Sequence, residues 1–574
     1  MASDYKSYYS VELRRLRQYA QEFAQANPAI APILGSPSVD PDIERLLEGV
    51  AFLNGHTRQK LDDEFPEIAQ ELSSMLMPQI LRPVPAATMM AFEPKASLKE
   101  PALVPAGTEL GSLPVEGVSC RFRTTVDVSI EQIEVGAAKW LTGDNGQIGL
   151  QLGLSLEGGA ASRWPGRIRL FLGDQFEQAT TLFMLLSCYV QRIDLVGGQG
   201  RRVSANNILA FPAFDEPLVP QPRNGMPAVG LVRELLHFPE KFLFVQIQDL
   251  DTLASSLGTH ISLEIWLDKN SHPLPELTAQ SFLSNVCPAV NLFSQSAEPV
   301  SLNHEVPDYL VLPDGLARQH HQIFSVESVT GLRQGQAAQR TYQPFSLLQF
   351  GASGQQLTYR TTVRPAMNGD WVETYLSVAY EPDEVPVPET LSIELTCTNR
   401  WLPEKLRLGE VCAATDTSPE RCSFRNITAV KGAVDAPRGE ELLWASIGHT
   451  ALNFMSLGDL ETTRALLRLY NSFRTNDHGA RAANERQIDG IASVDIAEET
   501  RLHRGTVIRG QRIRMQCDAA NWPSAGAMYL WGCVLARFFA TYASINIYTR
   551  FEMTDSAAGV EFKWPAMLGS KPLL

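Results

Sequence analysis

The periodicity of apolar residues changes once along the chain, near Pro83, and this change restricts the possible folds more than any other feature. Before it, apolar residues recur every three or four positions, the spacing of one face of an α-helix. After it, short alternating runs lie between Gly and Pro residues, as is typical of β-strands. We therefore predict an α+β, multidomain fold. It has an N-terminal helical arm at 1–82, a β-rich middle region at 83–425 with two subdomains, and a mixed α/β C-terminal domain at 426–574.

The composition is that of a large globular protein. The 574 residues predict three to four domains at about 150 residues each. Hydrophobic residues make up 44% and charged residues 20%, which excludes collagen-like and mostly disordered chains. The net charge of −15 disfavours general binding to nucleic acid or to anionic membranes, since both require clustered Lys and Arg. We expect instead that at least one partner protein presents a basic surface.

The predicted arm contains three amphipathic helices with narrow apolar faces. The first carries apolar residues between Tyr9 and Phe23, the second follows a cap at Asp40-Pro41, and the third ends at Pro78. An arm of this size cannot bury all of these faces within itself, so it must pack on the rest of the chain or on partner helices. The residues that we predict to bind partners are Leu13, Leu16, Ile43, Leu46, Leu47, Val50 and Leu53. The alternative is that these faces pack only against the chain's own middle region.

Targeting signals and cysteine spacing favour a cytoplasmic protein. The N-terminus has no apolar run of the kind found in secretory signals. The longest apolar stretch, Ala525–Ser544, contains Arg537 and predicts a buried helix rather than a membrane span. None of the eight cysteines forms a C-x-x-C pair, so we expect buried, reduced thiols.

No sequence motif indicates catalysis, a cofactor or a metal. Nucleotide-binding glycine patterns, the G-x-S-x-G elbow and H-E-x-x-H are all absent. The groups that come closest to a site are His320-His321, the trio His304, Glu305 and Asp308, and the acidic run Asp62-Asp63-Glu64. Adjacent side chains point apart on a helix or a strand, and polar runs near prolines are typical of exposed loops. We therefore predict a protein that is not an enzyme, with no catalytic residue, cofactor or metal.

Two further short sequences resemble functional motifs, but neither requires a catalytic role. Leu395–Arg400 is predicted to be a strand that runs into a loop. Asp489-Gly490 predicts a turn in which the glycine adopts a backbone conformation closed to other residues. We expect no catalysis at either.

Short strings between residues 8 and 565 match one family pattern in order. They include Glu44–Leu53, Lys60–Pro66, Phe238–Phe242, Pro288–Phe293, Leu395–Arg400, Leu452–Leu457, Tyr529–Phe539 and Trp564-Pro565. The chain thereby resembles the TssF family, also called VasA or ImpG, the baseplate wedge subunits of bacterial type VI secretion systems.

The resemblance implies a structural role with several protein partners. Two copies of TssF are expected to join one TssG, with TssK attached outside and TssE nearby. Six such wedges would surround the VgrG spike, beneath the sheath and the Hcp tube. The arm would supply helices to the bundle that ties the two copies to TssG. The implied plate is recruited from the cytoplasm to the complex anchored in the inner membrane, and it couples docking there to sheath polymerisation and contraction.

Two other functions remain open at this point. The chain could be the wedge protein of a phage-like contractile injection particle. It could also be a cytoplasmic hydrolase whose site is built from scattered His, Asp and Ser residues. The hydrolase requires a deep pocket in which polar groups with shifted pKa values converge.

Overall fold

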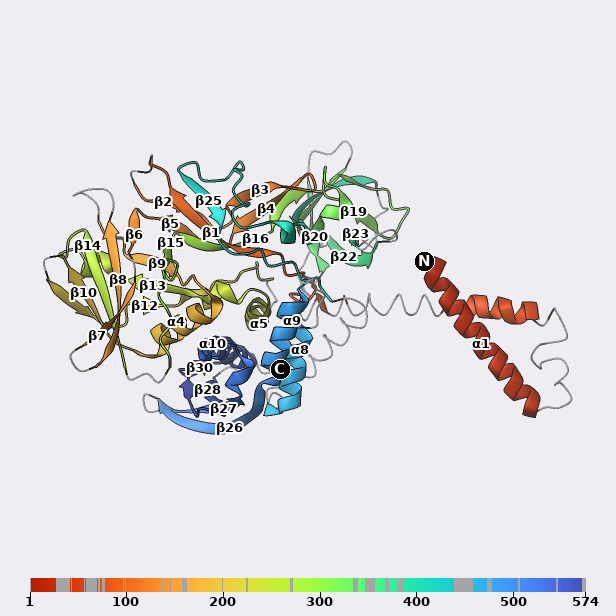
Figure 1. Ribbon diagram of the computed structural model, residues 1–574. Coiled ribbons are helices and arrows are strands. Elements are labelled where there is room, and N and C mark those ends of the chain that lie inside the picture. Colours follow the sequence, from red (N-terminus) through yellow and green to blue (C-terminus); the bar gives the residue numbers. More distant parts are fainter. Residues whose placement is uncertain are drawn as a thin grey trace.

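The chain folds around three buried apolar clusters, one of which is much larger than the others. Figure 1 shows how its helices and strands are arranged. The structure is a computed structural model. It describes all residues except 1, 27–41, 43, 56, 58–69, 71–72, 75–77, 97, 99, 137, 144–145, 157–162, 199, 223–225, 269–271, 334–338, 346–356, 367–370, 380–386, 438–457, 472–476, 504–505, 544–545 and 570–574. The mixed α/β, multidomain class predicted from the sequence is confirmed.

A five-stranded antiparallel sheet lies at the centre of the chain. Its strands, in spatial order, are β25 (Cys422–Asn426), β1 (Ala87–Pro94), β16 (Val286–Val290), β4 (Val118–Thr124) and β3 (Glu109–Val115). A small ribbon of β2 (Ala102–Val104) and β5 (Val128–Ile130) accompanies it. The sheet therefore joins segments that lie more than 300 residues apart in the sequence, since Phe92 pairs with Phe424.

The two middle strands of this sheet are buried on both faces. Successive side chains of a strand point to opposite faces. Met89 of β1 lies in the largest cluster, whereas Met90 lies in the second. Val286 and Cys287 of β16 are divided between the two clusters in the same way. The β1–β16 pair thus separates two cores and contributes to both.

Two further sheets enclose one side of the largest cluster. The first has the order β11 (Arg202–Ala205), β10 (Val190–Gly197), β14 (His260–Leu267), β8 (Ile148–Leu156) and β6 (Ile133–Val135), with β7 (Lys139–Thr142) also paired to β8. The second has the order β12 (Leu209–Ala210), β13 (Phe244–Gln248), β9 (Arg167–Phe171) and β15 (Leu283–Ser284). The helices of this part are α4 (Phe176–Cys188), α5 (Pro227–His237) and the short α6 (Leu250–Leu253).

An eight-stranded sheet surrounds the third cluster. Its strands are β17 (Phe293–Ser296), β24 (Glu389–Thr398), β20 (Gln322–Arg333), β21 (Arg340–Pro344), β22 (Thr358–Pro365), β23 (Val372–Val378) and β19 (Tyr309–Val311), with β18 (Val300–Leu302) also paired to β24. Leu391, Ile393 and Leu395 alternate along β24 and are buried. This alternation is the period of a strand with one face in a core.

The C-terminal part combines a sheet with three helices. The helices are α8 (Leu460–Asn471), α9 (His478–Asp489) and α10 (Ala525–Tyr542). The strands are β26 (Ile491–His503), β27 (Thr506–Cys517), β28 (Tyr548–Asp555), β29 (Glu561–Lys563) and β30 (Met567–Leu568). Strands β27 and β28 run parallel, and parallel neighbours require a crossover. Helix α10 provides this crossover and is buried beside the sheet.

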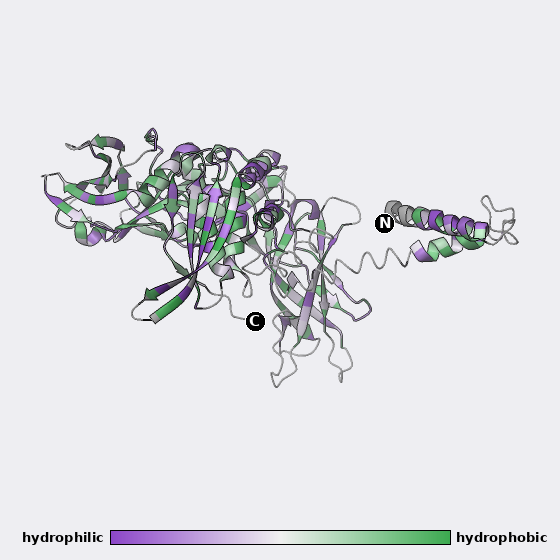
Figure 2. Ribbon diagram, turned by 90° about the horizontal axis from the view of Figure 1, so that it is seen from below, coloured by the Kyte–Doolittle hydropathy of each residue, from purple (hydrophilic) through white to green (hydrophobic). Residues whose placement is uncertain are grey.

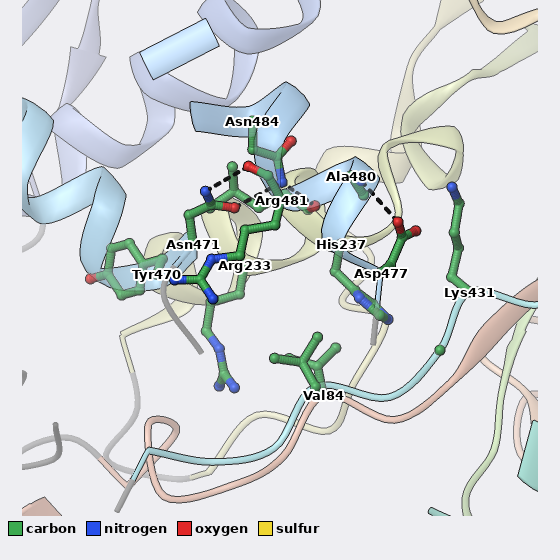
Figure 3. A pocket seen from close by; sticks show the side chains of 13 residues that line it. Val84, Arg233, His237, Lys431, Tyr470, Asn471, Asp477, Ala480, Arg481 and Asn484 are labelled. Atoms are coloured by element: carbon green, nitrogen blue, oxygen red, sulfur yellow. Dashed lines mark hydrogen bonds between the residues drawn. The ribbon is translucent and has the colours of Figure 1, made fainter. Parts of the chain in front are cut away.

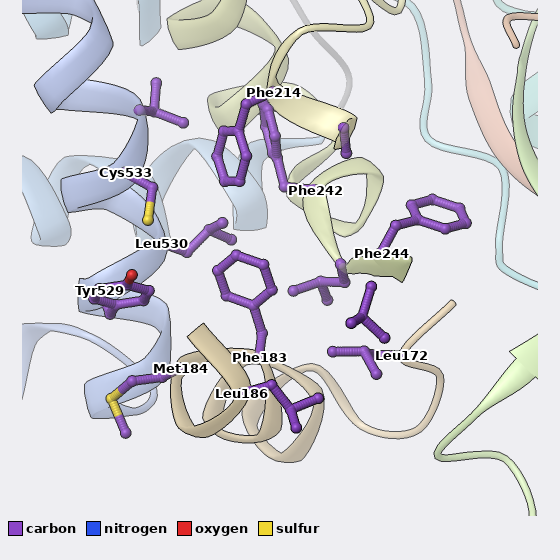
Figure 4. Packing of buried hydrophobic residues seen from close by; sticks show 14 of the residues in the cluster. Leu172, Phe183, Met184, Leu186, Phe214, Phe242, Phe244, Tyr529, Leu530 and Cys533 are labelled. Atoms are coloured by element: carbon purple, nitrogen blue, oxygen red, sulfur yellow. The ribbon is translucent and has the colours of Figure 1, made fainter. Parts of the chain in front are cut away.

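Helix α10 is a core helix, as predicted from the sequence. It packs on α4 and α5, and its aromatic residues belong to the largest cluster (Figure 4). Its Arg537 guanidinium lies 4.4 Å from the centre of the Phe214 ring, a cation–π contact that compensates for partial burial of the charge. Among the described residues, no helix combines the length and the apolar character that a membrane crossing requires.

The crossing of α10 over α4 depends on a glycine. A Cβ atom at Gly526 would lie only 2.2 Å from the Thr180 backbone oxygen. Two residues earlier, the Ser524 hydroxyl accepts a hydrogen bond from Ala527 N at 3.0 Å and lies 2.9 Å from the Thr180 hydroxyl. The helix therefore begins at a side-chain cap that also contacts its neighbour.

A buried arginine joins the start of the central sheet to the helices (Figure 3). Arg233 of α5 is 8% exposed, and its guanidinium donates hydrogen bonds to the carbonyl oxygens of Gln79 at 2.5 Å and Arg82 at 2.9 Å. On the other side of α5, Asn484 Nδ2 of α9 donates to Leu236 O at 2.8 Å. Nearby, Val84 and Val434 exchange backbone hydrogen bonds, so four separate segments meet at this junction.

Two expectations from the sequence need correction. Gly490 was expected to adopt a left-handed backbone, but its φ is −68°, an ordinary helical value. A glycine is needed here for steric reasons instead, because a Cβ atom would lie 2.6 Å from the Trp522 ring. All eight cysteines are free, as expected, but Cys188 and Cys412 are exposed rather than buried.

Replacing Gly526 by alanine should destabilise the protein. The added methyl group has no room against the α4 backbone, and overpacking of this kind costs about 1–3 kcal/mol. Gly198→Ala is the matched control, since a Cβ atom there meets nothing within 4 Å, and we expect a change below about 0.5 kcal/mol. Chemical unfolding of both variants measures the difference, and equal stabilities would contradict the proposed close contact.

Acidification should destabilise the junction through His237. Burial, followed by the nearby Lys431 charge, lowers the pKa of His237 to about 4. The unfolded chain binds a proton near pH 6.5, whereas the folded chain does not, so stability is complete above about pH 6.5 and falls as the pH approaches 4. The melting temperature of His237→Gln should therefore fall less steeply over this range than that of the wild type. His260→Gln, at an exposed position, should behave like the wild type.

Candidate interaction surfaces

Two N-terminal helices stand apart from the rest of the chain (Figures 1 and 2). They are α1 (Ala2–Ala26) and the helical residues 44–55. An ion pair between Arg17 and Glu44 links them across the gap in the sequence. Ala51 is fully buried, because one face of residues 44–55 packs within this unit.

The predicted partner-binding residues occupy this helical pair. Leu46 is 67% exposed, Leu53 is 65% exposed and Val50 is 37% exposed. Leu13, Leu16 and Leu47 are half-buried, and Ile43 lies outside the described residues. The predicted caps and third helix, at 40–41 and 65–76, also fall largely outside the described part of the chain. In the isolated chain, therefore, Leu46 and Leu53 do not bury themselves against the middle region.

The pair exposes further large apolar side chains that the sequence did not single out as partner-binding residues. Tyr19 is 63% exposed, and Phe23 and Phe52 are each 53% exposed. Side chains of this size are costly to leave in water, and contiguous exposed apolar surface marks an interaction site. Aromatic residues are also enriched at the centres of protein interfaces.

A direct contact ties residue 70 to the eight-stranded sheet. Gln70 Nε2 donates to Val363 O at 2.9 Å, and Val363 N donates to Gln70 Oε1 at 3.2 Å. The amide side chain thus imitates a strand partner of β22. This contact and the Arg233 junction hold the chain on both sides of residues 71–77.

The polar cavity at the junction is too small for a substrate (Figure 3). It encloses about 50 Å³, room for one or two waters, whereas ligand pockets span roughly 300–1,000 Å³. Burial lowers the pKa of Arg233 to about 10 and that of His237 to about 4. Asp477, also in the lining, caps α9 by accepting from Ala480 N at 2.9 Å. The two groups with shifted pKa values, Arg233 and His237, therefore lie at a structural contact between segments. They do not line a deep pocket of the kind that a hydrolase requires.

A larger hollow of about 620 Å³ lies between α5, α10 and β30. Its lining includes Leu231, Met567 and Leu568 and contains no Ser, His or Cys. Two of its charged groups are already engaged. Glu234 pairs with the buried Lys241, and Arg537 stacks on Phe214.

The histidine groups noted in the sequence are dispersed. His321 is buried, with Nδ1 3.0 Å from Ala317 O, whereas His320 is half-buried. His304 Nε2 lies 3.0 Å from Val387 O, and Asp308 forms an ion pair with Arg364 at 2.7 Å. The described residues contain no cluster of His, Cys, Asp or Glu suited to holding a metal ion. The acidic run 62–64 lies outside them.

One exposed feature was not anticipated from the sequence. The sequence pattern predicts a strand at 491–494, but β26 continues to His503 and forms a long hairpin with β27. Its outer end carries Leu502, which is 70% exposed, and Val507, which is 66% exposed. The alternation of apolar and polar residues weakens beyond Val494, so periodicity alone did not reveal the full strand.

Comparison with known proteins identifies the family. A family model described as "Type VI secretion system, TssF" matches residues 1–571. The "Type VI secretion system component TssF1" of Pseudomonas aeruginosa is 26% identical over 627 residues, covering 99% of each chain.

Solved structures agree with this assignment. A chain of the TssK-TssF-TssG baseplate subcomplex of a type VI secretion system superimposes with a TM-score of 0.78 at 26% identity, covering 93% of this chain and 99% of the other. A chain of a type VI baseplate complex has a TM-score of 0.60 at 23% identity over 99% of this chain and 100% of the other, which supports the fold. Because the family model spans nearly the whole sequence, the chain belongs to the TssF family of type VI secretion system baseplate proteins.

Proposed function

We propose that this chain assembles with TssG and TssK into a baseplate wedge. The support comes from the similar chain in the TssK-TssF-TssG subcomplex, which aligns over 93% of this sequence. The observation that carries the proposal within this molecule is the exposed apolar face of the N-terminal helices. Leu46 and Leu53 are about two-thirds exposed, as a surface designed for another subunit would be.

The arm at 1–82 is the proposed assembly unit. Its helices would join those of TssG and of a second copy of this chain in one bundle. Burying a leucine contributes about 1.5–3 kcal/mol, so Leu46, Leu53 and the half-buried Leu13, Leu16, Leu47 and Val50 together can support a stable contact. Ile43 would extend the same face. The Arg17–Glu44 ion pair fixes the two helices relative to each other and reduces the entropy lost on binding.

The wider role is a conformational one, without catalysis. In this proposal TssE lies nearby, and six wedges surround the VgrG spike beneath the Hcp tube and the sheath. The complex forms in the cytoplasm and docks on the membrane-anchored complex. The rigid body built on three cores transmits movement between partners, which agrees with a junction cavity of only about 50 Å³. No reaction is assigned to any residue.

Placing acidic residues on the apolar face of the arm should abolish wedge assembly. Leu46→Asp with Leu53→Asp places two carboxylates in the proposed bundle, and we expect recovery of TssG and TssK with the tagged chain to fall more than about tenfold. Asn54→Asp with Gln21→Glu adds the same charge at exposed polar positions and should leave recovery unchanged. Both variants should melt at the wild-type temperature. Undiminished recovery with the double Asp variant would contradict the proposed bundle.

The acidic net charge predicts that at least one partner contact weakens with salt. With a charge of −15, the chain should favour a basic surface, and screening reduces such contacts while leaving apolar ones intact. Binding to purified TssG and to purified TssK, measured separately from about 0.1 to 0.5 M NaCl, tests this. If the affinity for each partner is independent of the salt concentration, the net charge does not contribute to binding a basic partner surface.

A further inference from the structure

The outer end of the β26–β27 hairpin lies beyond the sheet that supports its base. Among the described strands, β28 pairs with β27 only from Gly510 to Cys517, and β26 pairs only with β27. The pairs Thr500–Arg509, Arg501–Ile508 and Leu502–Val507 therefore have no third strand beside them. Figure 2 shows this end projecting from the body. A two-stranded ribbon is marginally stable by itself in water, which favours a partner for this segment.

The apolar pair at the tip continues the core face of the hairpin. Residues paired across an antiparallel ribbon share a face, and that face recurs every second residue. Leu502 and Val507 thus lie on the same face as the pairs Ile496–Ile513 and Val494–Met515. Ile513 and Met515 are fully buried, whereas the tip residues are 70% and 66% exposed. The core face ends in an apolar pair that nothing in the described chain covers.

Two arginines lie beside this apolar pair, Arg509 on the same face of the ribbon and Arg501, paired with Ile508, on the opposite face. Arg501 and Arg509 are exposed, and neither forms an ion pair with a described carboxylate. Further down the hairpin the arginines are neutralised, since Arg512 binds Glu499 at 2.7 Å and Arg514 binds Glu552 at 3.3 Å. The tip is therefore locally cationic on a chain with a net charge of −15.

We propose that this tip docks into an apolar recess lined by carboxylates on another subunit of the baseplate. The proposal rests on the proposed assembly with TssG and TssK, and it adds a second contact distant from the arm. Leu502 and Val507 would fill the recess, Arg509 would meet a carboxylate on the same face, and Arg501 would meet one across the opposite face of the ribbon. Desolvated apolar centres with charged rims are the usual arrangement of a protein interface.

A second copy of this chain fits the tip less well. The hollow of about 620 Å³ between α5 and α10 contains the guanidinium of Arg537. Its Glu234 is already bound by Lys241, which leaves Asp215 alone to face two arginines. The charges of this hollow do not complement those of the tip, which favours a different protein as the occupant.

The test uses the full-length chain and an immobilised TssG–TssK complex from the same gene cluster. Leu502→Ser with Val507→Ser, and separately Arg501→Glu with Arg509→Glu, should each raise the Kd about tenfold or more. The control is Leu408→Ser, at a leucine that is 63% exposed on another part of the chain, and its Kd should equal that of the wild type. Melting temperatures of all variants should match, because these side chains contribute little to any core.

Hydrogen exchange on the wild-type chain tests the contact without any substitution. Amides of residues 498–509 should exchange more slowly in the TssG–TssK complex than in the free chain. Two results would overturn the proposal while leaving the proposed function intact. In the first, the wild type binds but hydrogen exchange at residues 498–509 is unchanged. In the second, the wild type binds and both hairpin variants have the same Kd as the control. Failure of the wild type to bind TssG–TssK would contradict the proposed function and, with it, this contact. If the chain alone forms dimers and the hairpin variants do not, the occupant is a second copy of the chain, and this result would also overturn the proposal.

Discussion

The architecture depends on one pair of strands that is buried on both faces. Strands β1 and β16 place alternate residues into the largest cluster and into the second one. A strand in this position has no face on which a polar side chain can reach water, and a shift of register by one residue would exchange the contents of the two cores. The pairing therefore fixes how the β-rich parts sit on the helical, C-terminal part.

The rest of the molecule divides into a rigid body and two projecting features. The body is held by the glycine contact between α4 and α10 and by the Arg233 junction. The N-terminal helices and the tip of the β26–β27 hairpin both leave this body and expose large apolar residues. In the proposed wedge, the body would carry movement between partners, and these two features would present surfaces to other subunits.

Much of the fold could be predicted because its elements have strong local periodicity. The spacing of apolar residues in the sequence predicts helices near 176–190, 460–473 and 525–543, and these correspond to α4, α8 and α10. Helices α5 and α9 were not expected. The latter, His478–Asp489, buries only Ile488 and so lacks an apolar stripe. The junction at Arg233 could not be predicted from the sequence either. Its hydrogen bonds go to backbone carbonyls more than 150 residues away, and every residue type has such a carbonyl.

The way Arg233 grips the chain has a mechanical consequence. Its hydrogen bonds are made to the peptide carbonyls of Gln79 and Arg82, so the grip is independent of the side chains at those positions. A pull on the N-terminal helices would reach Gln70 and its strand partner Val363 first, and then this guanidinium. From Arg233 the load would pass along α5 into α9 through Asn484. Tension applied at the arm would thus be shared with α5 and α9 before it reached β1.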